Sequence, residues 1–139
     1  MGSKIFKNEI LVRDKRIKFL EDLGGRLETK KLSKEEIQDL LNDKILEEAK
    51  ELYDAIKSKD KEEILKEYSD VLEVLDNMKF YLSLTDEEIN KVKDYRKKEF
   101  GGYKEGSYIE TIEIDEDNPL IDYYLARPEK YPKIDKQKD

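Results

Sequence analysis

The chain has 139 residues, no cysteine, no histidine and a formal net charge of −7 at neutral pH. Without cysteine it cannot form a disulfide, a thiolate metal site or a cysteine nucleophile. Without histidine it has neither a Ser-His-Asp triad nor imidazole ligands. Any catalytic or binding site must therefore use carboxylates, lysines, arginines, hydroxyl groups or the backbone.

Length and charge also bear on domain number and on the class of partner. A chain of 139 residues predicts a single domain over 1–139. The excess of acidic residues argues against nucleic-acid binding, because a phosphate backbone would repel such a chain. No stretch is long and apolar enough to span a membrane, and the N-terminus lacks the apolar core of a signal peptide. We therefore expect a cytoplasmic protein that contacts no membrane.

The N-terminal part is expected to contain one short helix. Residues 5–12 mix apolar and polar side chains and are interpreted as an extended or irregular lead. A helix over about 13–23 follows. Gly24-Gly25 should end it, because glycine readily adopts the left-handed conformation of a helix stop.

Two long helices form the centre of the chain. Ser33 with Glu36 makes a capping box, so a helix should begin there and end near Ser58. Asp60 repeats the capping pattern and begins a second helix over about 61–83. Because the connection is only a few residues long, the two helices should pack as antiparallel neighbours.

A fourth helix is predicted over about 86–100, with Thr85 and Glu88 as its capping box and Gly101-Gly102 as its stop. Its apolar face, expected to point to the core, consists of Ile89, Val92 and Phe100. A neighbouring face with i, i+3, i+7 spacing consists of Asn90, Lys93 and Lys97.

The C-terminal part, 105–134, is predicted to be an arm. Residues 107–114 are rich in β-branched side chains and favour a short strand or an extended segment. Asn118-Pro119 is typical of a helix start and predicts a small helix to about residue 126. The charged residues 135–139 are expected to be disordered. The predicted fold is thus an all-α antiparallel bundle of about four helices with an extended C-terminal arm.

Four carboxylates on the two long helices are the strongest functional signal. Glu48 and Glu51 share one face of the first helix, and Glu67 and Asp70 share one face of the second. Both pairs lie on or beside the apolar stripe, where an unpaired carboxylate is costly. In an antiparallel pair they lie at similar heights and can converge, which favours a divalent cation such as Mg²⁺.

The alternative is that these carboxylates are solvated charges in a highly charged chain. Lys44 lies four residues before Glu48, and Lys66 neighbours Glu67, so ordinary surface ion pairs can form. The basic residues are open to the same two interpretations. Asn90, Lys93 and Lys97 could contact a polyphosphate or could simply be a solvated helix face, and the same holds for Arg13 and Lys15.

The acidic pattern resembles that of a known superfamily. The order Glu-x-x-Glu, short turn, Glu-x-x-Asp is similar to that of the MazG-like all-α nucleoside triphosphate pyrophosphohydrolases, which include phosphoribosyl-ATP pyrophosphohydrolases. Leu11-Val12-Arg13-Asp14-Lys15 and Arg96-Lys97-Lys98-Glu99-Phe100-Gly101-Gly102-Tyr103 resemble the flanks of the small, single-domain house-cleaning branch. The resemblance covers about residues 10–104.

The resemblance implies a site and a reaction. The metal ligands for Mg²⁺, for which Mn²⁺ could substitute, would be Glu48, Glu51, Glu67 and Asp70. Glu51 is our hypothesis for the carboxylate that activates the attacking water. The substrate-binding residues would be Arg13, Lys15, Asn90, Lys93 and Lys97, the last standing where relatives often have arginine.

The implied reaction is hydrolysis of a canonical or non-canonical nucleoside triphosphate to monophosphate and pyrophosphate. Two alternatives remain open, namely phosphoribosyl-ATP hydrolysis and a non-catalytic helical interaction module. The superfamily usually forms dimers or tetramers. Two long helices and one shorter one also leave more apolar surface than one thin bundle can cover, so we expect a homodimer or homotetramer.

Overall fold

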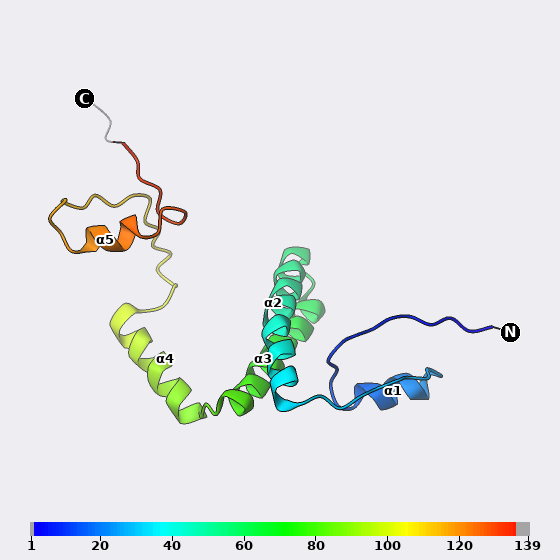
Figure 1. The fold of residues 1–139 in the computed structure, drawn as a ribbon. Helices are drawn as coiled ribbons and strands as arrows, with labels where there is room; N and C mark the ends of the chain where they lie inside the picture. Colours follow the sequence, from blue (N-terminus) through cyan, green and yellow to red (C-terminus); the bar gives the residue numbers. More distant parts are fainter. Residues whose placement is uncertain (1, 136–139) are drawn as a thin grey trace. The chain divides into compact units, whose positions relative to one another are not determined.

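The computed structural model describes residues 2–135, and all regular secondary structure in that range is α-helical (Figure 1). The helices are α1 (Arg16–Asp22), α2 (Lys34–Ser58), α3 (Lys61–Leu82), α4 (Asp86–Phe100) and α5 (Leu120–Leu125). The predicted all-α class is therefore confirmed. Segment 107–114 contains neither strand nor helix. Of the predicted disordered tail, residues 136–139 lie outside the described residues.

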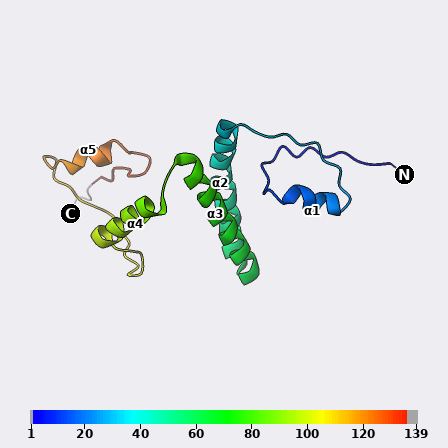
Figure 2. The same ribbon diagram turned by 90° about the horizontal axis from the view of Figure 1, so that it is seen from below.

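Contacts along the chain divide it into two compact units, Met1–Tyr95 and Arg96–Asp139. Within residues 2–135, α2 and α3 are the only two helices that contact each other. They lie side by side in both views of the ribbon (Figures 1 and 2). The prediction of one domain over 1–139 is not tested by this division and stays a prediction.

Local signals set the bounds of the α2–α3 hairpin. The Ser33 hydroxyl accepts from the Glu36 N–H, and the Glu36 carboxylate accepts from the Ser33 N–H, which completes the predicted capping box. Asp60 caps α3 by accepting from the N–H of Glu62. Lys59 adopts a left-handed conformation with φ 62°, so the chain reverses within two residues. This tight turn makes α2 and α3 antiparallel.

The turn also determines which residues lie opposite each other. Positions equally distant from Lys59-Asp60 along the two helices face one another, so Leu41 meets Met78 and Ile45 lies near Val74. Leu41, Val74 and Met78 form the buried core of the hairpin. The partly buried side chains packed against this core are Leu11, Ile37, Ile45 and Tyr81.

Much of the predicted apolar stripe is not buried. Within residues 2–135 the buried apolar side chains are Leu41, Ala55, Val74 and Met78. Ile56 is 55% exposed and Leu72 is 48% exposed. The expectation that the apolar face of α4 points to a core is wrong in this chain, because Ile89, Val92 and Phe100 are all exposed. A two-helix hairpin covers only one side of each helix, and the surplus apolar surface remains uncovered.

None of the helices in the described part of the chain combines the length and the apolar content that crossing a membrane would require.

Candidate metal and substrate site

Three carboxylates meet between α2 and α3. One oxygen each from Glu48, Glu67 and Asp70 lies within 4.8 Å of the other two. Glu48 comes from α2 and the other two from α3, at nearly equal distances from the turn. The antiparallel register of the hairpin thus brings acidic groups from separate helices to one point.

These carboxylates are poorly compensated. Glu67 is only 7% exposed although it is ionisable. One oxygen of Glu67 and one of Glu48, Oε2 in each, are buried without a hydrogen-bond partner. An unpaired buried carboxylate oxygen is costly, and three like charges this close repel one another. Oxygen ligands in such an arrangement fit a hard divalent cation such as Mg²⁺.

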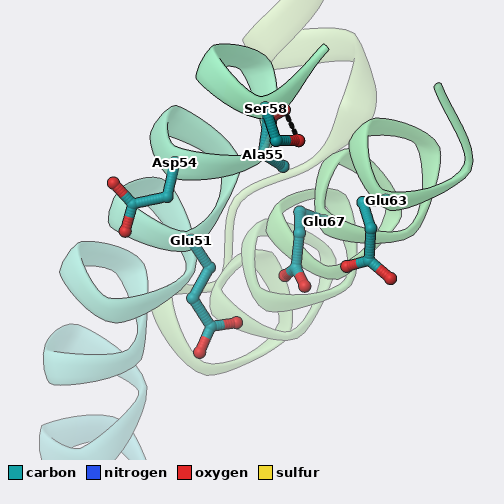
Figure 3. A pocket seen from close by; sticks show the side chains of 6 residues that line it. All are labelled: Glu51, Asp54, Ala55, Ser58, Glu63 and Glu67. Carbon is teal, nitrogen blue, oxygen red and sulfur yellow. Dashed lines mark hydrogen bonds between the residues drawn. The ribbon is translucent and has the colours of Figure 1, made fainter. Parts of the chain in front are cut away.

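Glu51 lies beside this cluster and does not belong to it. The side chain as a whole is exposed, but its carboxyl group turns toward the gap that Glu67 also faces (Figure 3). Loss of water around the carboxyl group, followed by the neighbouring carboxyl groups of Glu67 and Glu48, raises the pKa of Glu51 from 4.5 to about 7. Glu51 can therefore hold or release a proton near neutral pH.

Three cations surround the cluster at different distances. Lys44 Nζ lies 3.9 Å from Glu48 Oε1, and Lys66 Nζ lies 3.4 Å from Glu67 Oε1. These are the ion pairs expected for the solvated alternative. The closest contact is one that the sequence did not indicate, between Arg13 Nη2 and Asp70 Oδ1 at 2.7 Å.

A cavity of about 320 Å³ opens between the two helices toward their turn (Figure 3). It is lined by Glu51, Asp54, Ala55, Ser58, Glu63 and Glu67. Sequence reasoning missed Asp54 and Glu63. A signal was available, because Asp54 follows Glu51 by three residues and Glu63 precedes Glu67 by four, the same spacings that place side chains on one helix face. The cavity is therefore acidic, and a phosphate group could approach it only with a cation present.

The side chains of the other predicted substrate-binding residues are exposed. Lys15 is exposed where α1 begins. Asn90, Lys93 and Lys97 are exposed on α4. Over residues 2–135 the side chains of these four form no hydrogen bond or ion pair. Their predicted role stays a prediction.

A comparison with known protein families gives a match. The sequence model of a family described as phosphoribosyl-ATP pyrophosphohydrolase matches residues 18–92, which is more than half of the chain. The matched segment contains all four predicted acidic ligands and Asn90, whereas Arg13, Lys15, Lys93 and Lys97 lie outside it. No curated protein and no solved structure gives a significant match.

Proposed function

Because the chain belongs to the phosphoribosyl-ATP pyrophosphohydrolase family, whose members are hydrolases of a phosphoanhydride bond, we propose that phosphoribosyl-ATP is its substrate. The bond cleaved is the one between the α and β phosphates, and the products are pyrophosphate and phosphoribosyl-AMP. The observation that carries this proposal is a buried oxygen of Glu67 without a hydrogen-bond partner, in a residue that belongs to the group of three converging carboxylates. A non-catalytic module would have no use for so costly a group.

Glu48, Glu67 and Asp70 are the residues proposed to hold Mg²⁺, the ion that enzymes of this family use. When bound, magnesium would neutralise phosphate charge and lower the pKa of a coordinated water. Phosphoryl chemistry depends mainly on positioning and on charge neutralisation. A chain without histidine can therefore perform it with carboxylates and a cation.

Glu51 is proposed as the group that accepts a proton from the attacking water. Its carboxyl group adjoins the cluster without joining it, so it can act on a water positioned there. With a pKa of about 7 it is partly ionised at neutral pH, close to the optimum for a general base. Within the proposal, Glu51 acts mainly as a proton acceptor, although the resemblance assigns it as a metal ligand.

The basic residues are proposed to bind the phosphates. Arg13 offers a planar fork that can donate two hydrogen bonds to one phosphate. Lys15, Lys93 and Lys97 offer point charges, and Asn90 an amide. Lysine at position 97 makes a less directional contact than the arginine of many relatives.

A second substrate class has its own support. The segments that resemble the flanks of the house-cleaning branch, 11–15 and 96–103, lie outside the family match over 18–92. These flanks favour an ordinary or damaged nucleoside triphosphate as the substrate, hydrolysed at the same bond. The two candidates share the acidic cluster and differ only in what surrounds the base and sugar.

The enzyme is further proposed to act as a homodimer or homotetramer. Large apolar side chains on the hairpin are 44–75% exposed, among them Leu46, Leu65, Leu72 and Leu75. A second copy is the simplest partner that could cover them. Sedimentation of the wild type should give at least a dimer, and Leu72→Asp should shift it toward monomer. A monomeric wild type at working concentration would contradict this proposal.

The test of the activity is release of pyrophosphate in the presence of Mg²⁺. We expect the highest kcat/KM for phosphoribosyl-ATP among a panel that includes ATP, the deoxynucleotides and oxidised nucleotides. A clear preference for a triphosphate would select the second candidate. Orthophosphate as the sole product would contradict the assigned bond.

Glu51→Gln tests the proposed base. It should abolish turnover while metal binding persists, and Glu47→Gln, an exposed change on the same helix, serves as the control. Full turnover by the Glu51 variant would remove its proposed role.

A further inference from the structure

The contact between Arg13 and Asp70 joins the N-terminal segment to the acidic cluster. Arg13 Nη2 donates to Asp70 Oδ1 at 2.7 Å across 57 positions of sequence. Asp70 is also one of the three residues whose oxygens converge. The guanidinium is thus the cation closest to a carboxylate of the cluster. The ammonium groups of Lys66 and Lys44 lie farther from their partners, at 3.4 Å from Glu67 and 3.9 Å from Glu48.

The backbone at Arg13 is also held in place by neighbouring contacts that do not involve its side chain. Leu11, two residues earlier, packs against the core formed by Leu41, Val74 and Met78. The N–H of Arg16 donates to the carbonyl oxygen of Arg13 at 2.9 Å, which forms the turn into α1. The Arg13 side chain is itself 59% exposed. The backbone near Arg13 is therefore held beside the cluster, while its exposed guanidinium has room to move from Asp70 to another hydrogen-bond acceptor.

A guanidinium and a divalent cation cannot both be close to Asp70 without repelling each other. We propose that Arg13 is an exchangeable counter-cation: it pairs with Asp70 while the cluster lacks metal, leaves it when Mg²⁺ binds, and then donates to a substrate phosphate. The second half of this exchange rests on the proposed function. The bidentate geometry of arginine suits a carboxylate and a phosphate equally, so the same group can serve both partners.

The energetic cost of the exchange is small. An ion pair whose basic partner is mostly exposed is weak, because water screens it. Removing Arg13 should therefore tighten metal binding by only roughly two- to fivefold. The same removal should weaken substrate binding, because a phosphate loses its donor. Metal affinity and substrate affinity should change in opposite directions.

The experiment is calorimetric titration of the full chain with Mg²⁺ or Mn²⁺, without nucleotide. Arg13→Gln is compared with wild type and with Arg16→Gln, a matched charge change at a residue whose guanidinium lies over the Phe19 ring, 4.9 Å from its centroid. We expect tighter metal binding only in the Arg13 variant. Equal or weaker binding in that variant would overturn the proposal.

A second titration uses α,β-methylene-ATP, which cannot be hydrolysed at the proposed bond, with the metal at saturation. Arg13→Gln should bind this analogue several-fold more weakly than wild type. If Arg13 only supported the fold, both affinities would fall together. Asp70→Asn provides a further check, because in that background Arg13→Gln should no longer improve metal affinity.

A third test uses NMR spectroscopy of the wild type alone and so does not depend on whether a variant folds. The side-chain N–H signals of Arg13 in the wild type should move when Mg²⁺ is added, and move again with the analogue. Unchanged signals on metal addition would overturn the exchange. A wild type that binds no metal at all would instead refute the proposed function, so the two failures are distinguishable.

Discussion

The acidic face of the α2–α3 hairpin and the basic face of α4 differ in how they are built. The acidic residues come from two helices, converge, and include a nearly buried glutamate. On the basic face, the amide Asn90 and the two lysines Lys93 and Lys97 come from one helix and are exposed. Regular spacing on a single helix produces only a row of side chains. When a second helix packs against such a row, it excludes water and adds its own side chains, so that polar groups from both helices can bind one ligand.

The largest effect should follow from the buried member of the acidic face. Glu67→Gln keeps the side-chain shape but removes the charge, so metal binding and turnover should fall by at least about 100-fold, as for loss of a single charge-stabilising group. Without metal the same change should stabilise the fold by about 1 kcal/mol, because an uncompensated buried charge is gone. Pyrophosphate release and thermal unfolding in EDTA measure the two effects.

Glu47→Gln is the matched control, since it removes the charge of an exposed glutamate on α2. It should leave both measurements close to wild type. If Glu67→Gln retained wild-type turnover, the buried carboxylate would not be needed for catalysis. The acidic face would then differ from the basic face of α4 only in burial.

The basic face should show a smaller effect of a different kind. Lys93→Ala and Lys97→Ala should each raise KM by roughly tenfold, because each removes a charge-assisted contact to phosphate. Neither should change the melting temperature, since these exposed side chains form no hydrogen bond or ion pair within residues 2–135. Steady-state kinetics and calorimetry separate the two quantities.

Lys91→Ala, on another side of the same helix, is the control for the loss of positive charge. An equal rise in KM for this variant would mean that α4 contributes only general electrostatic attraction. A fall in melting temperature for the lysine variants would instead show that the face is structural.

The smallest effect concerns Glu51 and pH. Its pKa is raised from 4.5 to about 7 in the folded chain, so between these values the folded state holds a proton that the unfolded state has released. Metal-free stability should therefore fall as pH rises from about 5 to about 8, and the penalty is complete above the folded pKa. Because the side chain is exposed and screened by water, we expect a loss below about 1 kcal/mol.

Thermal unfolding in EDTA at several pH values measures this trend, and Glu51→Gln should flatten it. Saturating Mg²⁺ should also weaken the trend, because a cation beside Glu51 favours its ionised form. A melting temperature that rose over the same pH range would contradict the raised pKa.

Much of the fold could be read from the chain because helix ends are local. The Ser33-Glu36 and Thr85-Glu88 capping boxes both form as predicted. Gly101, with φ 76°, ends α4 where a glycine stop was expected. The tight turn between the two long helices then sets their antiparallel register, so the meeting of Glu48 with Glu67 and Asp70 also followed from local information.

What only the tertiary structure decided is the environment of each group. The Arg13–Asp70 contact joins residues 57 positions apart, and no periodicity encodes such a pairing. That Glu51 stands beside the cluster while Glu48 joins it depends on side-chain packing across the helix pair. Burial of Glu67 and exposure of Leu72 depend in the same way on which side of each helix the partner covers, and helical spacing alone cannot specify that side.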